Sequence, residues 1–456
     1  MKIIIAGCGK AGSEVASQLS REGHEITVAD KDAIKLRTLT ERIDVLGVCG
    51  NAVSSATLIE AGAKTADLLI ATTDSDEHNL LCCLFARKIG TTHTIARIRD
   101  PEFFSEIPYI REELNLSMVI NPELYAAREI ARLLKFPEAL KIDTFARGRV
   151  DIINLILPKD SPLSNVKVCE LNPIVKGNLL LCAVKRAEGG GVVSIPDGNF
   201  ELKGSDEVWF VAANHKQAVN FIKAAGLSVL SNVKNVVFIG GGKITYYTAR
   251  LLDETGIKVK IIESNLERCR YLSEELPGAI IINGDGTDQQ LIVEEGVGDA
   301  DAVCAMTGID EENIMFSLFA ASISKAKLVT KIDRISFRDV INNMNLGSIV
   351  NPQNITADAI VSYVRAMNNS TGSNVLSMCT IADDAAEALE FRIINETSFT
   401  GIPIKDLKIK DDILIAAINR NSVILTPNGQ STLEVGDTVI VVTTRKGLED
   451  LEDIFK

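Results

Sequence analysis

The sequence predicts an α/β protein in which two doubly wound parallel sheets are each followed by a small α+β domain. Apolar runs alternate with helical stretches, which is typical of a parallel sheet covered on both faces. The order of these elements then occurs twice along the 456 residues. Corresponding residues of the two copies stand 233 or 234 positions apart, as in Gly7 and Gly240, Asp30 and Glu263, and Asn79 and Asn313.

In the first copy, five apolar runs are expected to be strands, at residues 3–6, 26–29, 45–48, 68–71 and 95–98. Asn121-Pro122 is expected to begin a helix that ends near Leu134, because Asn suits the N-cap and Pro the first helical position. The apolar stripe of this helix suits packing against something outside its own sheet. The stripe comprises Leu124, Ala127, Ile130, Ala131 and Leu134.

From about residue 150 the pattern changes to short strands separated by turn signals such as Pro196-Asp197-Gly198. Strands are expected at 152–157, 179–184, 191–195 and 207–212, and helices at 163–171 and 215–225. The strands of the second small domain are expected from about Leu389. The predicted domains are N1 (1–138), C1 (139–228), N2 (229–370) and C2 (371–456).

The composition argues against several classes of protein. The net charge is −13 and no basic block is concentrated in one place, which argues against nucleic-acid binding. The nine cysteines contain no Cys-x-x-Cys pair, so we expect reduced thiols, not a disulfide framework or a zinc site. Without a signal peptide or an apolar run of roughly 18 residues, a soluble cytoplasmic protein is expected.

A glycine-rich turn between a buried strand and a helix predicts a nucleotide site in N1, which makes this domain Rossmann-like. The first glycine makes a tight turn, the second lets the backbone approach a pyrophosphate, and the third lets helix and strand pack closely. Asp30 is placed to bind both ribose hydroxyls, which favours NAD or NADH over NADP(H), although Lys31 weakens that preference. The predicted turn residues are Gly7, Cys8, Gly9, Lys10, Ala11 and Gly12. Cys8 is interpreted as a small residue tolerated in the turn, with redox sensitivity as the alternative.

Four more residues are expected at the carboxyl ends of the N1 strands, where open α/β sheets bind ligands. Asn51 follows the third strand and could read an adenine edge, while Thr73 and Asp74 follow the fourth. Arg97, in the fifth, could reach the phosphates or the second half of a dinucleotide. A structural ion pair with a nearby acid is an equally good interpretation of Arg97.

The second copy departs from the pattern because Thr245 replaces the third glycine. Its predicted binding residues are Gly240, Gly241, Gly242, Lys243 and Ile244 of the turn, with Glu263 as the ribose-binding acid and Lys331 in the place of Arg97. A degenerate site, an altered nucleotide preference and an empty structural copy all fit these residues.

Catalytic machinery is not apparent in the sequence. The four histidines sit in turns or at helix starts, and a dehydrogenase needs a proton donor or acceptor near the nicotinamide. We therefore expect a sensor and not an enzyme. The alternatives are an NAD-dependent oxidoreductase of a small metabolite and a redox-sensing DNA regulator, the latter opposed by the lack of a visible helix-turn-helix.

Over essentially its whole length the chain resembles the RCK (or KTN) family, and within it the two-repeat regulatory subunits of Trk potassium uptake systems. Four segments carry the resemblance: residues 2–12 with Asp30, 60–63 with Asp67, 73–79, and 96–99. The small domains resemble the RCK C-terminal (TrkA-C) module.

The resemblance implies a homotetramer whose eight RCK units form a ring on the inner face of the cell membrane. The ring would dock on a potassium-translocating membrane subunit of Trk type and gate it. NAD or NADH, with ATP and ADP as further candidates, would bind the N-type domains at the residues named above.

Overall fold

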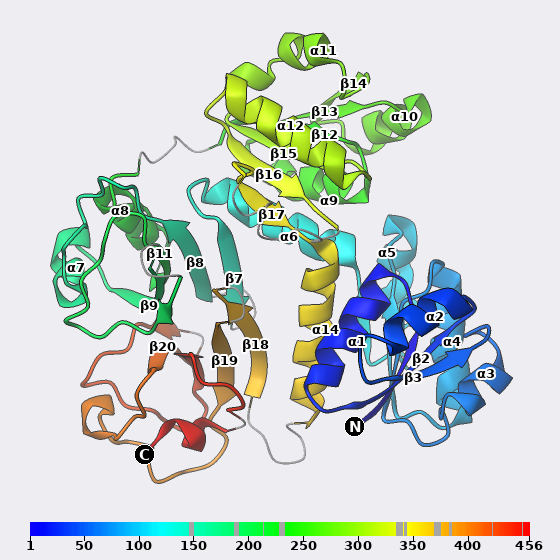
Figure 1. Ribbon diagram of the computed structural model, residues 1–456, viewed down its shortest axis with the longest axis horizontal. Coiled ribbons are helices and arrows are strands. Elements are labelled where there is room, and N and C mark those ends of the chain that lie inside the picture. The colour runs from blue at the N-terminus through cyan, green and yellow to red at the C-terminus, as the bar shows by residue number, and fades with distance from the viewer. Residues whose placement is uncertain are drawn as a thin grey trace. The chain divides into compact units, whose positions relative to one another are not determined.

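The computed structural model describes residues 1–145, 150–186, 191–212, 214–227, 233–333, 341, 344–368, 375–382, 385–421, 423–448 and 450–456 (Figure 1). They form two compact units. Unit 1 holds Met1–Ala131 and Asn235–Val361, and unit 2 holds Arg132–Lys234 and Ser362–Lys456. Each unit therefore takes one segment from each half of the chain. The predicted boundaries after residues 228 and 370 lie outside the described residues.

N1 forms a six-stranded parallel sheet in the order β3-β2-β1-β4-β5-β6. Because β1 lies between β2 and β4, strand order reverses there, and open α/β sheets bind ligands at such a switch point. The five strands predicted for N1 are confirmed, and β6 extends the sheet. The strands are β1 (Lys2–Ala6), β2 (Glu25–Asp30), β3 (Leu46–Cys49), β4 (Leu68–Ala71), β5 (His93–Arg97) and β6 (Met118–Ile120).

Helices cover the N1 sheet and begin where the sequence offers caps. The side chains of Asp32, Ser75 and Asp100 each accept a hydrogen bond from a backbone N–H in the first turn of the helix that follows. The helices are α1 (Lys10–Arg21), α2 (Ala33–Thr40), α3 (Ser55–Glu60), α4 (Asp76–Ile89) and α5 (Pro101–Ile110).

N2 repeats this architecture, with the strand order β14-β13-β12-β15-β16-β17. Its strands are β12 (Asn235–Ile239), β13 (Lys258–Glu263), β14 (Ala279–Asn283), β15 (Ala302–Ala305), β16 (Lys327–Lys331) and β17 (Ser348–Val350). Its helices are α9 (Lys243–Leu252), α10 (Leu266–Glu275), α11 (Gln289–Glu294) and α12 (Asp310–Ile323), with 3₁₀ turns at Asp253–Thr255 and Val297–Asp299. The predicted duplication of the parallel sheet is therefore confirmed.

The last helix of each repeat makes a hydrogen bond to the other repeat. Helix α6 (Pro122–Lys135) follows N1, and Asn121 at its start donates a hydrogen bond of 2.9 Å to the Tyr247 hydroxyl on α9. Helix α14 (Pro352–Asn368) follows N2, lies beside α1 (Figure 1), and receives a hydrogen bond on Asp358 from Gln18. The predicted stripe of α6 is buried except for Leu124, which is partly exposed. Its expected packing outside its own sheet stays a prediction.

Unit 2 contains two five-stranded antiparallel sheets, ordered β10-β9-β11-β8-β7 in C1 and β18-β19-β22-β20-β21 in C2. The C1 elements are β7 (Lys141–Phe145), β8 (Val150–Ile156), α7 (Val168–Val175), β9 (Leu179–Lys185), β10 (Val193–Ser194), β11 (Glu207–Ala212) and α8 (His215–Ala224). The C2 strands are β18 (Val375–Ile381), β19 (Ala386–Arg392), β20 (Ile413–Arg420), β21 (Val423–Leu425) and β22 (Thr438–Thr443). C2 also has 3₁₀ turns at Ile404–Asp406 and Leu451–Ile454, and its first strand begins 14 residues before the expected Leu389.

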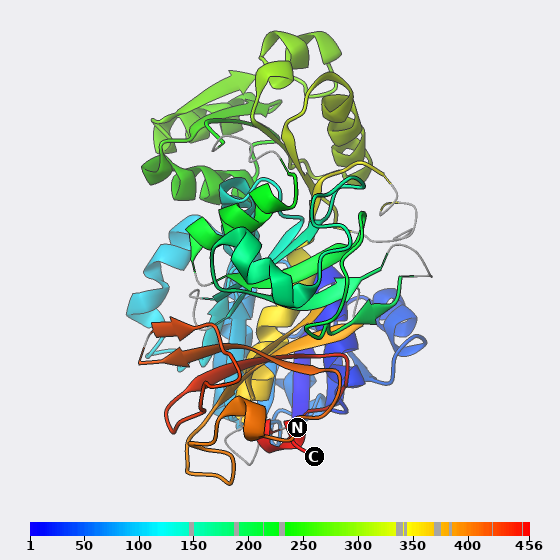
Figure 2. The same ribbon diagram turned by 90° about the vertical axis from the view of Figure 1, so that its left-hand side faces the viewer.

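The two sheets of unit 2 share one hydrophobic core. Trp209 and Phe145 of C1 pack in the same buried cluster as Ala388, Ala416 and Ala417 of C2. Figure 2 shows the green C1 strands above the orange and red strands of C2. Small residues on the C2 sheet make room for the large aromatic side chains of C1, which allows close face-to-face packing.

None of the helices among the described residues is both long enough and apolar enough to cross a lipid bilayer.

Candidate nucleotide site

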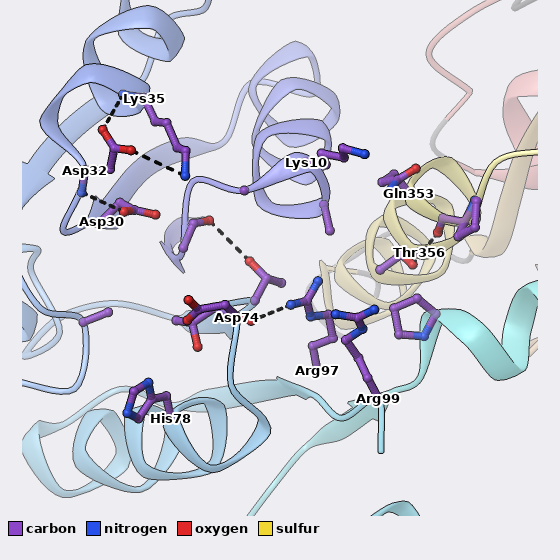
Figure 3. A pocket seen from close by; sticks show the side chains of 18 of the residues that line it. Lys10, Asp30, Asp32, Lys35, Asp74, His78, Arg97, Arg99, Gln353 and Thr356 are labelled. Atoms are coloured by element: carbon purple, nitrogen blue, oxygen red, sulfur yellow. Dashed lines mark hydrogen bonds and ion pairs between the residues drawn. The ribbon is translucent and has the colours of Figure 1, made fainter. Parts of the chain in front are cut away.

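A pocket of about 590 Å³ opens at the carboxyl edge of the N1 sheet. It brings together nine of the eleven residues predicted for the first site; Cys8 and Gly12 are not among the residues that line it. Figure 3 shows Asp30, Asp32 and Lys35 toward one end, and Arg97, Arg99 and Gln353 toward the other. The nine are Gly7, Gly9, Lys10, Ala11, Asp30, Asn51, Thr73, Asp74 and Arg97.

The three glycines of the first turn have separate roles. Gly7 has a φ of +106°, and a Cβ there would lie 2.9 Å from the carbonyl of Thr72. A Cβ on Gly12 would lie 2.0 Å from the Gly7 oxygen, so only glycine lets the helix pack this closely. Gly9 caps α1, lines the pocket and faces open space. The backbone at Gly9 is therefore the part of the turn that a pyrophosphate can approach.

Asp30 is fixed in place by the turn it faces. Its Oδ2 accepts the Cys8 N–H at 2.5 Å and its Oδ1 accepts the Asp32 N–H at 2.9 Å. Asp30 lines the pocket, and the remaining lone pairs of its carboxylate can accept hydrogen bonds from ribose hydroxyls. Neighbouring Lys31 reaches toward Asp74 at 3.7 Å on the exposed rim.

Cys8 is a structural residue of the turn. Its side chain is 4% exposed, and burial raises the pKa of its thiol. Since thiolates are the reactive form of cysteine, both effects oppose redox chemistry at this position. The interpretation of Cys8 as a tolerated small residue agrees with this environment.

A buried amide joins the ends of β4 and β5. Asn79 is fully buried, accepts the Thr73 N–H at 2.7 Å and donates to the Arg97 carbonyl at 2.8 Å. Arg97 in turn donates from its guanidinium to the Thr73 carbonyl at 2.5 Å. No described acidic side chain lies within ion-pair distance of Arg97, which leaves its guanidinium available to a ligand.

Several residues that line the pocket were not predicted from the sequence. Arg99 and Glu123 of N1 form an ion pair of 2.6 Å at the pocket wall. Asp333, Gln353 and Thr356 come from N2, more than 230 residues away in sequence from the turn they face. The alternate spacing of Arg97 and Arg99 along one strand end was a usable signal for Arg99. No local pattern in the N2 sequence predicts that its residues line a pocket at the N1 turn.

The second turn keeps the glycine geometry but alters the packing behind it. Gly240 has a φ of +103°, and Gly241 donates to Glu263 at 2.7 Å, as Cys8 does to Asp30. Thr245 is buried and its hydroxyl donates to the Gly240 carbonyl at 2.6 Å. Arg268 donates from Nε to the Gly241 carbonyl at 2.7 Å. The turn therefore accommodates the extra side chain at the third position.

Two residues predicted for the second site line the first pocket. These are Ile244 and Lys331. Lys331 donates to the Thr307 carbonyl at 3.2 Å, which reproduces the contact of Arg97 with Thr73 in N1. Lys243 instead forms an ion pair of 3.2 Å with Asp100 of N1. The ligand role of Gly240, Gly241, Gly242, Lys243 and Glu263 stays a prediction.

The fold is shared with solved structures of the GsuK channel. The GsuK channel bound to NAD matches 98% of this chain and 77% of its own, with a TM-score of 0.62 and 17% identity. The GsuK RCK domain matches with the same TM-score and covers 92% of its own chain. GsuK bound to ADP matches 80% of this chain with a TM-score of 0.50 and 14% identity. At this identity the likeness establishes the RCK fold.

Sequence relatives span the full length of the chain. Residues 3–122 and 236–352 match the TrkA-N domain, and residues 388–456 match the TrkA-C domain. The Trk system potassium uptake protein TrkA homolog of Archaeoglobus fulgidus is 31% identical, with 100% of both chains covered. TrkA of Halomonas elongata is also 31% identical, over 100% of this chain and 99% of its own. The chain belongs to the TrkA family of potassium uptake proteins, which carry RCK-type nucleotide-binding folds.

Proposed function

We propose that this protein is a nucleotide-sensing regulatory subunit that forms a gating ring on a Trk-type potassium-uptake protein and controls potassium transport. The observation that carries the proposal is the composite pocket, whose wall comes from the glycine turn of N1 and from N2. A ligand that contacts both repeats has a different affinity for each of their relative arrangements. Differential affinity is the requirement for a ligand-controlled switch.

The ligand proposed for this pocket is NAD or NADH, with ADP and ATP as alternatives. Asp30 supports a ribose diol, and the start of α1, where the N-cap Gly9 offers no side-chain hydrogen bond, supports a pyrophosphate. The volume of about 590 Å³ lies in the range of small-molecule sites. The solved relatives named for NAD and ADP agree with this ligand class.

Ring assembly is supported by an exposed apolar face that the duplication preserves. Leu81 on α4 is 42% exposed, and Met315, its counterpart 234 residues later on α12, is 64% exposed. Phe85 and Ile323, one or two turns further along these helices, are each 38% exposed. Two equivalent apolar faces on one chain suit repeated contacts between neighbouring chains, which close into rings. Four chains would supply eight RCK units.

The partner and the cellular location follow from this proposal. The membrane component would be a polytopic potassium-translocating subunit, and the ring would sit peripherally on its cytoplasmic side. No catalytic role is assigned to the pocket. The names of the full-length relatives, Trk system potassium uptake proteins, support this arrangement.

Affinity purification of the tagged chain from detergent-solubilised native membranes tests the proposal. We expect a polytopic potassium-transport protein to co-purify, in an amount that changes when NADH or ATP is added. A chain recovered without such a partner, together with steady turnover of NADH in the presence of a metabolite, would overturn it in favour of an oxidoreductase.

A further inference from the structure

Two ion pairs join the repeats, and each comes from the lysine that begins a glycine-turn helix. Lys10, the first residue of α1 in N1, pairs with Asp333 of N2 at 3.2 Å. Lys243, the first residue of α9 in N2, pairs with Asp100 of N1 at the same distance of 3.2 Å. The link is therefore reciprocal, because each repeat contributes one cation and one anion.

The two acids are held in place independently of these lysines. Asp333 also pairs with Lys331 of its own repeat at 3.2 Å, and the side chains of this pair are only 13% and 11% exposed. Burial alone would raise the pKa of Asp333, yet Lys331 and Lys10 together hold it below its usual range. Asp100 is the N-cap of α5, and its Oδ1 accepts the Glu102 N–H at 3.0 Å. Neither acid depends on the opposite repeat for its position.

The lysines are the more mobile partners. The side chain of Lys10 is 49% exposed and that of Lys243 is 37% exposed, so both ammonium groups are accessible to ions in solution. Each lysine begins a helix whose first turn has no acidic residue. The positive end of a helix dipole disfavours a cation at this place, and the acid of the other repeat offsets that cost.

Half-exposed pairs of this kind are weak and sensitive to salt. Mobile ions screen an exposed pair, whereas they screen a buried pair much less. The Debye length falls from about 10 Å in about 0.1 M salt to about 3 Å in about 1 M salt. The shorter length is close to the distance of 3.2 Å between the atoms of each pair. Rising salt therefore weakens both links between the repeats, while the buried pair of Lys331 with Asp333 persists.

We propose that the pairs Lys10–Asp333 and Lys243–Asp100 form a latch between N1 and N2 that opens as the ionic strength rises. An open latch lets the repeats change their relative arrangement without a nucleotide. Its consequence rests on the proposed function, since uptake of potassium with its counter-ions raises the ionic strength to which the latch responds. Opening requires no bound cation, because different monovalent salts screen the pairs equally at the same concentration.

The reactivity of the lysine amines measures the latch directly. The full chain, without nucleotide or membrane partner, would be labelled with an amine-specific acetylating reagent in about 0.1 M and about 1 M KCl. Mass spectrometry would quantify each lysine relative to Lys64, which is exposed and has no ion pair among the described residues. We expect the relative reactivity of Lys10 and Lys243 to rise about twofold or more at the higher salt concentration. Lys331 should stay protected at both concentrations.

Variants connect the pairs to the contact between repeats. The readout is hydrogen exchange at the starts of α6 and α9, which the hydrogen bond of 2.9 Å between Asn121 and Tyr247 joins. In the natural protein, exchange there should be about twofold or more faster in about 1 M than in about 0.1 M KCl. With Lys10→Gln and Lys243→Gln combined, it should be fast at both concentrations.

Arg37→Gln is the matched control for these variants. It removes an exposed ion pair of 3.8 Å with Glu41 inside α2, which does not join the repeats. This variant should keep the salt response of the natural protein. Thermal unfolding at both salt concentrations confirms that each variant is folded.

The outcomes separate the latch from the proposed function. Lysine reactivities that do not change with salt, or an equal salt response in the double variant and the natural protein, would overturn the latch. A response to KCl that the same concentration of NaCl fails to reproduce would also overturn it, in favour of a bound potassium ion. These measurements contain no nucleotide, so their failure leaves nucleotide sensing intact. Failure of every adenine nucleotide to bind in calorimetry would overturn the proposed function instead.

Discussion

Lys10, at the start of the first nucleotide-site helix, forms an ion pair of 3.2 Å with Asp333 of the other repeat. Lys243, at the corresponding place in the second repeat, pairs with Asp100 of the first, also at 3.2 Å. Each glycine turn is thus tied through its lysine to the opposite repeat. Phosphates bound at the start of α1 would compete with Asp333 for Lys10, which gives ligand binding a direct route to the contact between repeats.

Substitution of Gly9 separates binding from folding. A methyl group in Gly9→Ala meets no atom within 4 Å in the protein but occupies the approach to the helix start. We expect an unchanged melting temperature and NADH affinity reduced by about tenfold or more. Calorimetry and differential scanning fluorimetry measure the two quantities.

Gly12→Asp is expected to abolish nucleotide binding for a different reason. Its Cβ would lie 2.0 Å from the Gly7 carbonyl oxygen, so the turn itself must change shape. The apolar faces of α4 and α12, proposed above as ring contacts, belong to other helices than this turn, so the variant should still assemble in light scattering. Normal NADH affinity in Gly12→Asp would contradict the assignment of the site.

The hydrogen bond between Asn121 and Tyr247 should stabilise unit 1 measurably. Tyr247→Phe leaves the fully buried Asn121 amide with one partner fewer, at an expected cost of about 1–2 kcal/mol in unfolding free energy. Tyr109→Phe is the matched control, since Tyr109 is 78% exposed and its loss should change little. Urea unfolding compares the two; similar stabilities would count against the contact.

The same tyrosine predicts a dependence on pH. Burial raises the pKa of Tyr247 to about 12, so the folded state holds this proton more tightly than the unfolded chain, whose tyrosines titrate near about 10. The stabilisation is present below pH of about 10 and is lost as the pH rises toward 12. The stability difference between the natural protein and Tyr247→Phe should therefore shrink across that interval, and a constant difference would contradict the burial argument.

Trp209 reports on the packing of the two sheets in unit 2. It is the single tryptophan of the chain and is 3% exposed in the shared core. Ala417→Asp buries an unpaired carboxylate in that core, so we expect a red-shifted emission and a loss of about 3 kcal/mol or more. Val423→Asp, at a 59% exposed position of the neighbouring strand, should leave the emission unchanged.

The apolar faces of α4 and α12 predict the oligomeric state. Leu81→Asp combined with Met315→Asp puts a charge on both faces, and we expect light scattering to report a smaller species than the natural protein. Ile34→Asp, an apolar residue 72% exposed on α2, serves as the control. Retention of the full assembly in the double variant would place the contact elsewhere.

Much of this fold can be predicted from the sequence because the residue patterns that specify its elements are local. The strands of N1, the glycine turn and the Asn121-Pro122 helix start depend on neighbouring residues. The composite pocket depends on how α6 and α14 cross between repeats, a long-range event that no local pattern encodes. Lys331 illustrates the difference: its position in β16 was predictable, but its presence in the pocket of N1 was not.

The glycine turn of N2 shows a second limit of prediction from sequence. Thr245 stands where the pattern has its third glycine, yet its hydroxyl hydrogen-bonds to the Gly240 carbonyl and becomes part of the turn. Whether a substitution blocks a motif depends on side-chain rotamer and backbone adjustment, which spacing alone does not specify.

The most direct test of the account is nucleotide control of potassium flux. The chain and its co-purified membrane partner would be reconstituted into vesicles, and potassium uptake measured with and without NADH for the natural protein and Gly9→Ala. The account predicts that NADH changes uptake through the natural protein by severalfold and through Gly9→Ala hardly at all. Uptake that is indifferent to every adenine nucleotide, or an equal response in both proteins, would contradict it.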